Sequence, residues 1–85
     1  MSSPFPYIQV AGENSAVIYF GDVASAEIAA QVQQCADLIA SQLGAVLIDI
    51  VPSYASLLVI YNAFEIDHLA VNKALRKILS NLAEV

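Results

Sequence analysis

The fold of this chain is decided by the stretch Ile50–Tyr61, which reads IVPSYASLLVIY. One strand ends at a short Pro-Ser-Tyr loop, and a second strand with almost no polar residues follows at once. A strand at the surface of a small domain normally alternates apolar and polar residues, because one face meets water. Here both faces are apolar, so both need cover: Leu57, Val59 and Tyr61 on one, Leu58 and Ile60 on the other.

The composition indicates more apolar surface than a small core can hold. The chain has 85 residues, which predicts a single domain, 1–85. Apolar residues make up 59% without glycine, whereas typical domains have about 45–50% with glycine included. Charged residues are only 13%. A domain of this length buries a limited share of its surface, so we expect an exposed apolar interface.

The charge pattern argues against two classes of partner. The net charge is −5, and the basic residues are Lys73, Arg76 and Lys77. Binding of nucleic acid or of an anionic membrane needs a basic face, so neither is expected. The three cations come near the end of a predicted helix, where they would favour its dipole; this interpretation is preferred to an anion site.

Cysteine usage and the apolar runs suggest an intracellular protein. Cys35 has no cysteine partner for a disulfide, and its helical spacing places it in the core. Residues 1–6 lack the basic and apolar regions of a secretory signal. The longest charge-free run, residues 50–64, is too short to span a membrane. We therefore expect a cytoplasmic location.

The periodicity predicts the order β-β-α-β-β-α. Helix signals include Ser25 and Asp67 as N-caps, Gly44 as a C′ glycine, and apolar stripes of period 3.6. The stripes comprise Ile28, Val32, Cys35, Ala36, Ile39 and Leu43 in the first helix and Val71, Leu75, Ile78 and Leu82 in the second. The strands are expected at residues 7–11, 15–20, 45–51 and 56–61, with a turn at 12–14 and helices at about 26–43 and 68–82.

This order predicts an α+β fold, a two-layer sandwich with an antiparallel four-stranded sheet and both helices on one face. Ala16, Ile18 and Phe20 would share the inner face of the second strand, and Asp49 would mark the outer face of the third. The other face of the sheet is then open. We expect it to dock on another subunit or domain.

No convincing catalytic constellation is visible, so no catalytic, cofactor-binding or metal residue is expected. His68 is the only histidine and is interpreted as a solvated residue at a helix start. Glu13 and Asp22 flank the second strand and are interpreted mainly as surface acids. The glycines are too scattered for a phosphate loop. The residues expected to contact a partner are Pro52, Tyr54, Ser56, Leu57, Leu58, Val59, Ile60 and Tyr61.

Two segments resemble a known family. Residues 12–22, GENSAVIYFGD, are similar to its hairpin pattern "G-D/E-x-A-hydrophobic-x-hydrophobic-x-F-G". Residues 51–61, VPSYASLLVIY, are similar to its "V-P-[AS]-Y-x-S-L-L-V-x-Y" segment. The family is that of the B-type subunit of 5-oxoprolinase, also called KipI-like or allophanate hydrolase subunit one. Its members are related to part of the carboxyltransferase domain of urea carboxylase.

The resemblance implies a role inside an assembly. Members usually join a small N-terminal α+β domain to a cyclophilin-like β-barrel, which residues 1–85 do not contain. They pair with a homologous C-type subunit and, with a LamB/YcsF-type subunit, cleave 5-oxoproline to glutamate using ATP. ATP is thus implied for the complex, while no cofactor is expected on this domain.

Three functional hypotheses follow. The chain is a component of an ATP-dependent 5-oxoprolinase, an amide hydrolase complex, acting through subunit or domain contact. Alternatively, it is a regulatory module that inhibits a sensor histidine kinase, as one family member is described to do. The third possibility is a free-standing domain that buries its open sheet face in a homodimer.

Overall fold

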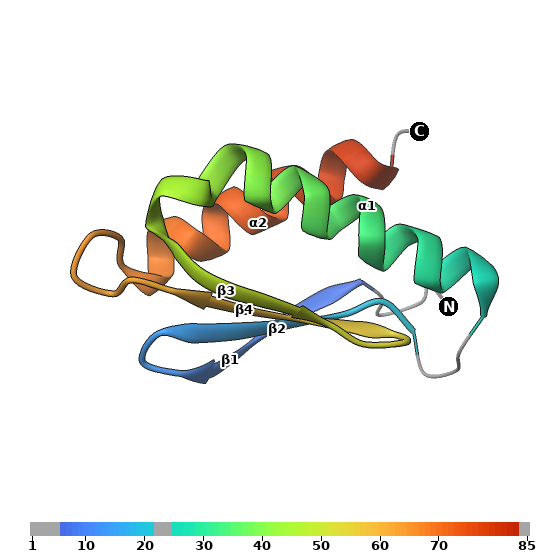
Figure 1. Ribbon diagram of the computed structural model, residues 1–85, viewed down its shortest axis with the longest axis horizontal. Helices are drawn as coiled ribbons and strands as arrows, with labels where there is room; N and C mark the ends of the chain where they lie inside the picture. The colour runs from blue at the N-terminus through green and yellow to red at the C-terminus, as the bar shows by residue number, and fades with distance from the viewer. Residues whose placement is uncertain (1–5, 22–24, 84–85) are drawn as a thin grey trace.

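A computed structural model describes residues 6–21 and 25–83, and the structural statements below refer to these residues. Two hairpins alternate with two helices, in the predicted order (Figure 1). No helix in the described part is long and apolar enough to cross a membrane. The elements are β1 (Tyr7–Gly12), β2 (Ser15–Tyr19), α1 (Ala26–Leu43), a 3-10 turn η1 (Gly44–Val46), β3 (Leu47–Pro52), β4 (Ser56–Tyr61) and α2 (His68–Ala83).

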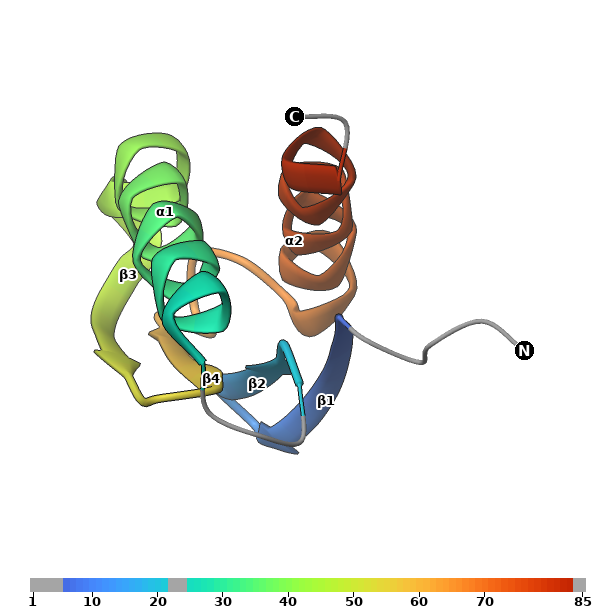
Figure 2. The same cartoon turned by 90° about the vertical axis from the view of Figure 1, so that its right-hand side faces the viewer.

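The four strands form one antiparallel sheet in the order β1-β2-β4-β3. The central joint pairs β2 with β4, from Ser15 opposite Ile60 to Tyr19 opposite Ser56. Both helices lie on the same side of the sheet, α1 over the β3 side and α2 over the β1 side (Figures 1 and 2). The predicted two-layer α+β fold is therefore confirmed.

The core lies between the helices and one face of β2 and β4. The buried strand residues alternate along the chain, as the period of a strand requires. The helices add stripes with the predicted period, and Cys35 is among their buried residues. The core comprises Ala16, Ile18, Phe20, Val32, Cys35, Ala36, Ile39, Leu57, Val59, Tyr61, Val71, Leu75, Ile78 and Leu79. The side chain of Leu82, predicted to end the second stripe, lies outside the described part.

Both predicted N-caps are confirmed. The hydroxyl of Ser25 accepts a hydrogen bond from the Ile28 N–H at 3.1 Å. A carboxylate oxygen of Asp67 accepts one from the Ala70 N–H at 2.8 Å. Each cap satisfies one of the backbone N–H groups that the first turn of a helix leaves without a partner.

Two details differ from the expectations. Gly44 directly follows α1, as expected, but its φ of −51° and ψ of −35° are right-handed, whereas a C′ glycine is usually left-handed. The chain closes α1 with the tighter turn η1, in which the Leu47 N–H donates to the Gly44 carbonyl; this needs no positive φ. As a result Ala45 lies in η1, and β3 starts at Leu47 rather than at residue 45.

The expected position of the cations at a helix end is also wrong. Helix α2 runs from His68 to Ala83, and its last turn contains no basic residue. Lys73, Arg76 and Lys77 therefore lie in the middle of the helix, where the dipole does little for a cation because its effect is confined to the terminal turns.

Candidate functional site

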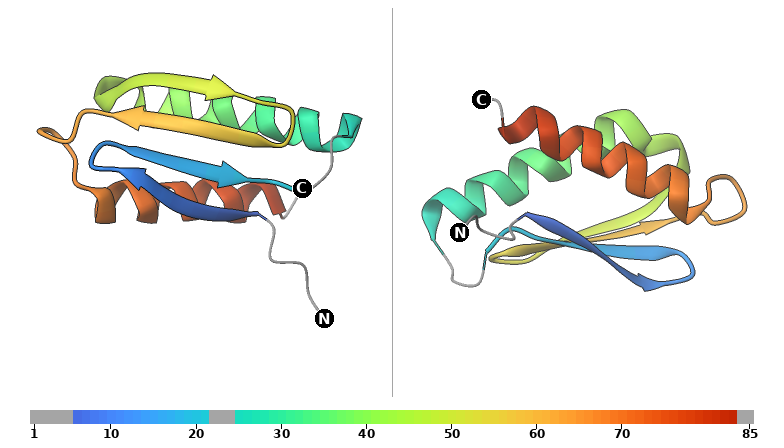
Figure 3. Two further views of the ribbon diagram at one scale, coloured as in Figure 1. Left: turned by 90° about the horizontal axis from the view of Figure 1, so that it is seen from below. Right: turned by 180° about the vertical axis from the view of Figure 1, so that it is seen from behind.

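The sheet face opposite the helices carries a strip of apolar side chains. Val17 of β2 lies opposite Leu58 of β4 where these two central strands pair. Val51 of β3 lies opposite Leu58 on the other side of β4. Val17, Leu58 and Ile60 are half-buried, and Val51 is 45% exposed. Seen from below, this face has no helix over it (Figure 3, left). We call it the open face and define it as Tyr7, Gln9, Ser15, Val17, Tyr19, Asp49, Val51, Ser56, Leu58 and Ile60.

Polar and aromatic groups surround this apolar strip. On the β3 side, an Asp49 carboxylate oxygen accepts a hydrogen bond from the neighbouring Ile50 N–H at 2.8 Å. On the β1 side, the rings of Tyr7 and Tyr19 stack with their centroids 5.0 Å apart. An apolar centre with a polar rim is the usual anatomy of a protein–protein interface.

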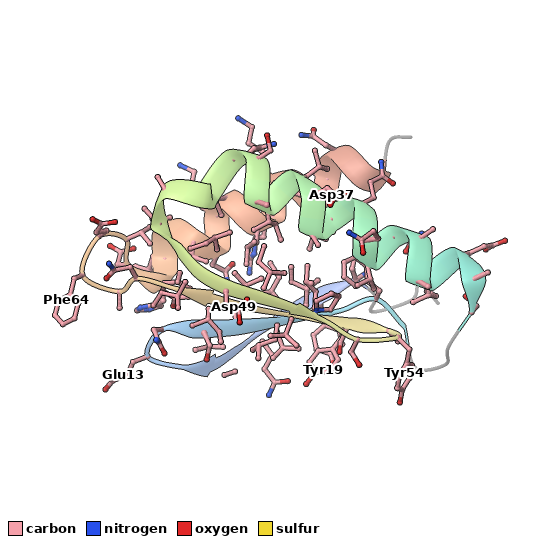
Figure 4. The ribbon with its side chains drawn as sticks, in the orientation of Figure 1. Glu13, Tyr19, Asp37, Asp49, Tyr54 and Phe64 are labelled. Atoms are coloured by element: carbon pink, nitrogen blue, oxygen red, sulfur yellow. The ribbon has the colours of Figure 1, made fainter. Side chains whose placement is uncertain are left out.

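A hollow of about 220 Å³ lies at one end of the open face, beside the β3–β4 turn. Tyr19 and Tyr54 both project away from the helices here (Figure 4). The turn is held by two main-chain bonds: the Ser53 N–H donates to the Ser56 carbonyl at 2.8 Å, and the Phe20 N–H to the Ala55 carbonyl at 2.9 Å. The hollow is lined by Tyr19, Gly21, Ser53, Tyr54, Ala55 and Ser56. Two hydroxyl-bearing residues predicted to contact a partner, Tyr54 and Ser56, thus come together.

The structure divides the other predicted contact residues between two faces. Leu58 and Ile60 lie on the open face with Ser56. The side chains of Leu57, Val59 and Tyr61 are 0%, 0% and 1% exposed beneath the helices, so they cannot touch a partner, and the expectation for them is corrected. Pro52 is exposed, but it pairs with Leu57 and therefore belongs to the helix side at the end of β3.

The far end of β4 is tied to the β1–β2 turn. The Tyr61 N–H donates to the Asn14 carbonyl at 2.9 Å, and the Tyr61 hydroxyl donates to the Glu13 carbonyl at 3.4 Å. Burial, followed by the nearby charge of Asp67, raises the pKa of Tyr61. A tyrosine hydroxyl is protonated at neutral pH in any case, and the raised pKa extends this donor state to higher pH.

The sequence reasoning missed Val17, Val51 and the Tyr7–Tyr19 pair. Alternation within residues 15–20 places Val17 and Tyr19 on the face opposite the predicted inner face, so the sequence could have indicated these two residues. The sequence could not indicate that β2 pairs with β4, because no local pattern specifies this pairing, which brings Val17 against Leu58.

The described residues hold few groups suited to chemistry. Within residues 6–21 and 25–83, no three or more His, Cys, Asp or Glu side chains gather as a metal site. His68 is exposed at the start of α2, as interpreted from the sequence. Burial raises the pKa of Cys35 to about 11, so its thiol is inert at neutral pH. Glu13 is exposed in the β1–β2 turn, and its suggested neighbour Asp22 lies outside the described residues.

Fold and face together define a class: a small two-layer α+β domain that leaves one apolar sheet face available for contact. Residues 6–85 match the family described as "Carboxyltransferase domain, subdomain C and D". The chain belongs to this family. The family is found in the group of 5-oxoprolinase B-type, KipI-like and allophanate hydrolase proteins, so the resemblance noted in the sequence is confirmed. Among curated proteins, none gives a significant match.

A solved structure has the same fold as this chain. The chain is similar to the conserved uncharacterized protein PH0987 from Pyrococcus horikoshii, with 35% identity and a TM-score of 0.86. The match covers 92% of this chain but 36% of that protein. The chain thus spans about a third of the length of this relative.

Proposed function

We propose that this chain acts as the small domain of a B-type 5-oxoprolinase subunit, inside an ATP-dependent amide hydrolase complex of the cytoplasm. Its open face would bind a larger domain or a partner subunit. The observation that carries the proposal is the apolar strip of Val17, Val51, Leu58 and Ile60, half-buried or exposed with no helix over it. Family membership supports the kind of assembly.

The size of the open face bears on what it would bind. Four strands of about six residues cover roughly 20 Å by 15–20 Å, or about 300–400 Å². Each partner in a stable interface buries about 800 Å². The contact would therefore extend beyond the sheet, and the hollow with Tyr54 and Ser56 is the adjoining surface that offers hydroxyl groups.

Candidate partners are those of the family: a cyclophilin-like barrel, a homologous C-type subunit and a LamB/YcsF-type subunit. In this proposal ATP and 5-oxoproline are handled mainly by those partners. The domain contributes the surface on which the complex assembles.

The test is reconstitution with the C-type and LamB/YcsF-type subunits, followed by light scattering and by an assay for ATP-dependent formation of glutamate. Leu58→Asp places a charge in the centre of the open face and should abolish both assembly and activity, because the carboxylate would be buried without a partner. Phe64→Asp is the matched control, since Phe64 is fully exposed away from this face. Circular dichroism verifies that both variants fold. Normal assembly of Leu58→Asp would refute the proposal.

The alternatives give different results with the same proteins. A homodimeric domain would show a stable dimer mass without partners, and Leu58→Asp would dissociate it. A regulatory module would change the autophosphorylation of a sensor histidine kinase at saturating concentration, and would do so without the other subunits.

A further inference from the structure

A second surface lies between the outer edge of β1 and helix α2. Two hollows, of about 450 and 400 Å³, meet at Arg76, which lines both. Helix α2 runs beside β1 in the view from below and over it in the end view (Figures 2 and 3). We call this surface the β1–α2 groove; it is lined by Pro6, Tyr7, Ile8, Val10, His68, Leu69, Asn72, Lys73, Arg76, Leu79 and Ser80.

The groove has an apolar floor because α2 does not fully cover β1. Val10 pairs with Ala16 and Ile8 pairs with Ile18, so all four side chains are on the helix side of the sheet. Ala16 and Ile18 are 5% and 0% exposed, whereas Val10 is 53% exposed. At β1, the outermost strand on this side of the sheet, the helix side of the sheet is therefore only partly covered.

The main chain of β1 is also available along this step. Strand β1 stands at one end of the sheet and pairs with β2 alone among the strands of the described part. Such an edge can accept an added strand through its outward N–H and C=O groups.

The helix wall gives the groove a charge opposite to that of the molecule. The chain carries −5 overall, and its three Lys and Arg residues all lie on α2. Lys73 and Arg76 line the groove, and His68 stands at its end. Across residues 6–21 and 25–83, no carboxylate forms an ion pair with Lys73 or Arg76. These cations are therefore free to meet an acidic group from outside.

We propose that the β1–α2 groove binds an extended segment of a partner protein that carries a central carboxylate flanked by apolar side chains. The segment would pair with β1 as a fifth strand. Side chains two residues apart share one face of a strand, so the carboxylate would meet Arg76 and Lys73 while the apolar residues on either side meet Val10 and Ile8. The length of β1, about 20 Å, suits a peptide rather than a small anion.

The test uses an acetylated peptide amide, Thr-Val-Thr-Glu-Thr-Val-Thr, titrated into the isotope-labelled domain while backbone amide shifts are followed. Saturable shifts should fall on β1 and α2. A peptide with Gln in place of Glu should bind about two- to fivefold more weakly, as expected for one solvent-accessible ion pair. Arg76→Gln should remove the difference between the two peptides. Lys77→Gln loses the same charge outside the groove and should keep the difference.

Several results would overturn the proposal. These are the absence of saturable binding, equal affinity for the Glu and Gln peptides, or shifts confined to the open face. Equal shifts from free glutamate would show a small-anion site instead, and unchanged binding of a peptide N-methylated at alternate residues would exclude strand pairing. Because the groove and the open face share few residues, this test is independent of the assembly test with Leu58→Asp.

Discussion

The two faces of strand β4 differ although they share one backbone. Leu57 is 0% exposed beneath the helices, whereas its neighbour Leu58, with an identical side chain, is half-buried on a face without a helix. The first residue contributes to a closed core. The second lies in the same strand, opposite Val17 on one side and Val51 on the other, but stays available to a partner. The apolar residues of one strand therefore fall into two sets, one that closes the core and one that the core does not use.

The largest expected effect is the difference in stability between the two variants that truncate these leucines in the isolated chain. Leu57→Ala leaves a cavity in a closed core and should lower the free energy of unfolding by about 3 kcal/mol. Leu58→Ala should lower it by less than about 1 kcal/mol, because its side chain is only partly removed from water. Urea denaturation followed by circular dichroism measures both. Equal losses would mean that the open face is covered in solution.

The thiol in the core predicts a pH dependence. The pKa of Cys35 is raised by burial from 9.0 to about 11, so the folded state holds its proton at pH values where the unfolded state has lost it. Stability is thus fully present below pH 9 and falls between pH 9 and about 11, by about 2–3 kcal/mol. The free energy of unfolding of the wild type and of Cys35→Ala, measured at several pH values between 9 and about 11, tests this effect. A parallel decline in the two proteins would contradict it.

A smaller effect separates two tyrosines on opposite faces. Tyr61→Phe loses the hydrogen bond to the Glu13 carbonyl and should cost about 0.5–1 kcal/mol. Tyr19→Phe keeps the ring that stacks on Tyr7 and should leave stability unchanged. Thermal unfolding provides the comparison. A loss of stability in Tyr19→Phe, with none in Tyr61→Phe, would contradict this prediction.

The smallest expected change in stability concerns Val51. Val51→Thr keeps the shape and β-branching of an exposed strand residue, so the free energy of unfolding should change by no more than about 0.5 kcal/mol. Binding of an apolar dye should nevertheless fall, because the substitution puts a hydroxyl on the open face. Ile50→Thr, on the helix side, is the control that should destabilise the fold.

Local patterns predicted the elements well because each is a periodic, amphipathic segment. The alternation through Ala16, Ile18 and Phe20 and the stripe through Val32, Cys35 and Ile39 identified buried residues before any packing was known. The caps at Ser25 and Asp67 were recognisable for a similar reason, since a cap acts within one turn of chain.

Features that depend on distant segments were not predictable in the same way. The strand order fixes which apolar residues gather on the open face, and it depends on pairing between β2 and β4. Gly44 shows a local failure: a glycine after a helix permits a left-handed turn but does not require one. The β1–α2 groove depends on the position of α2 over the sheet, which the helix sequence alone does not reveal.

The central joint of the sheet also shapes the folding reaction. Each hairpin closes a short loop, whereas Ser15 and Ile60 pair with each other although α1 and β3 separate them along the chain. Closing so long a loop is slow because its entropic cost comes before the contacts form. We therefore expect the hairpins to form before the β2–β4 pairing, and this pairing to be the slow step of folding. Until it closes, both apolar faces of β4 are exposed, so this is the stage at which the chain is most prone to aggregate.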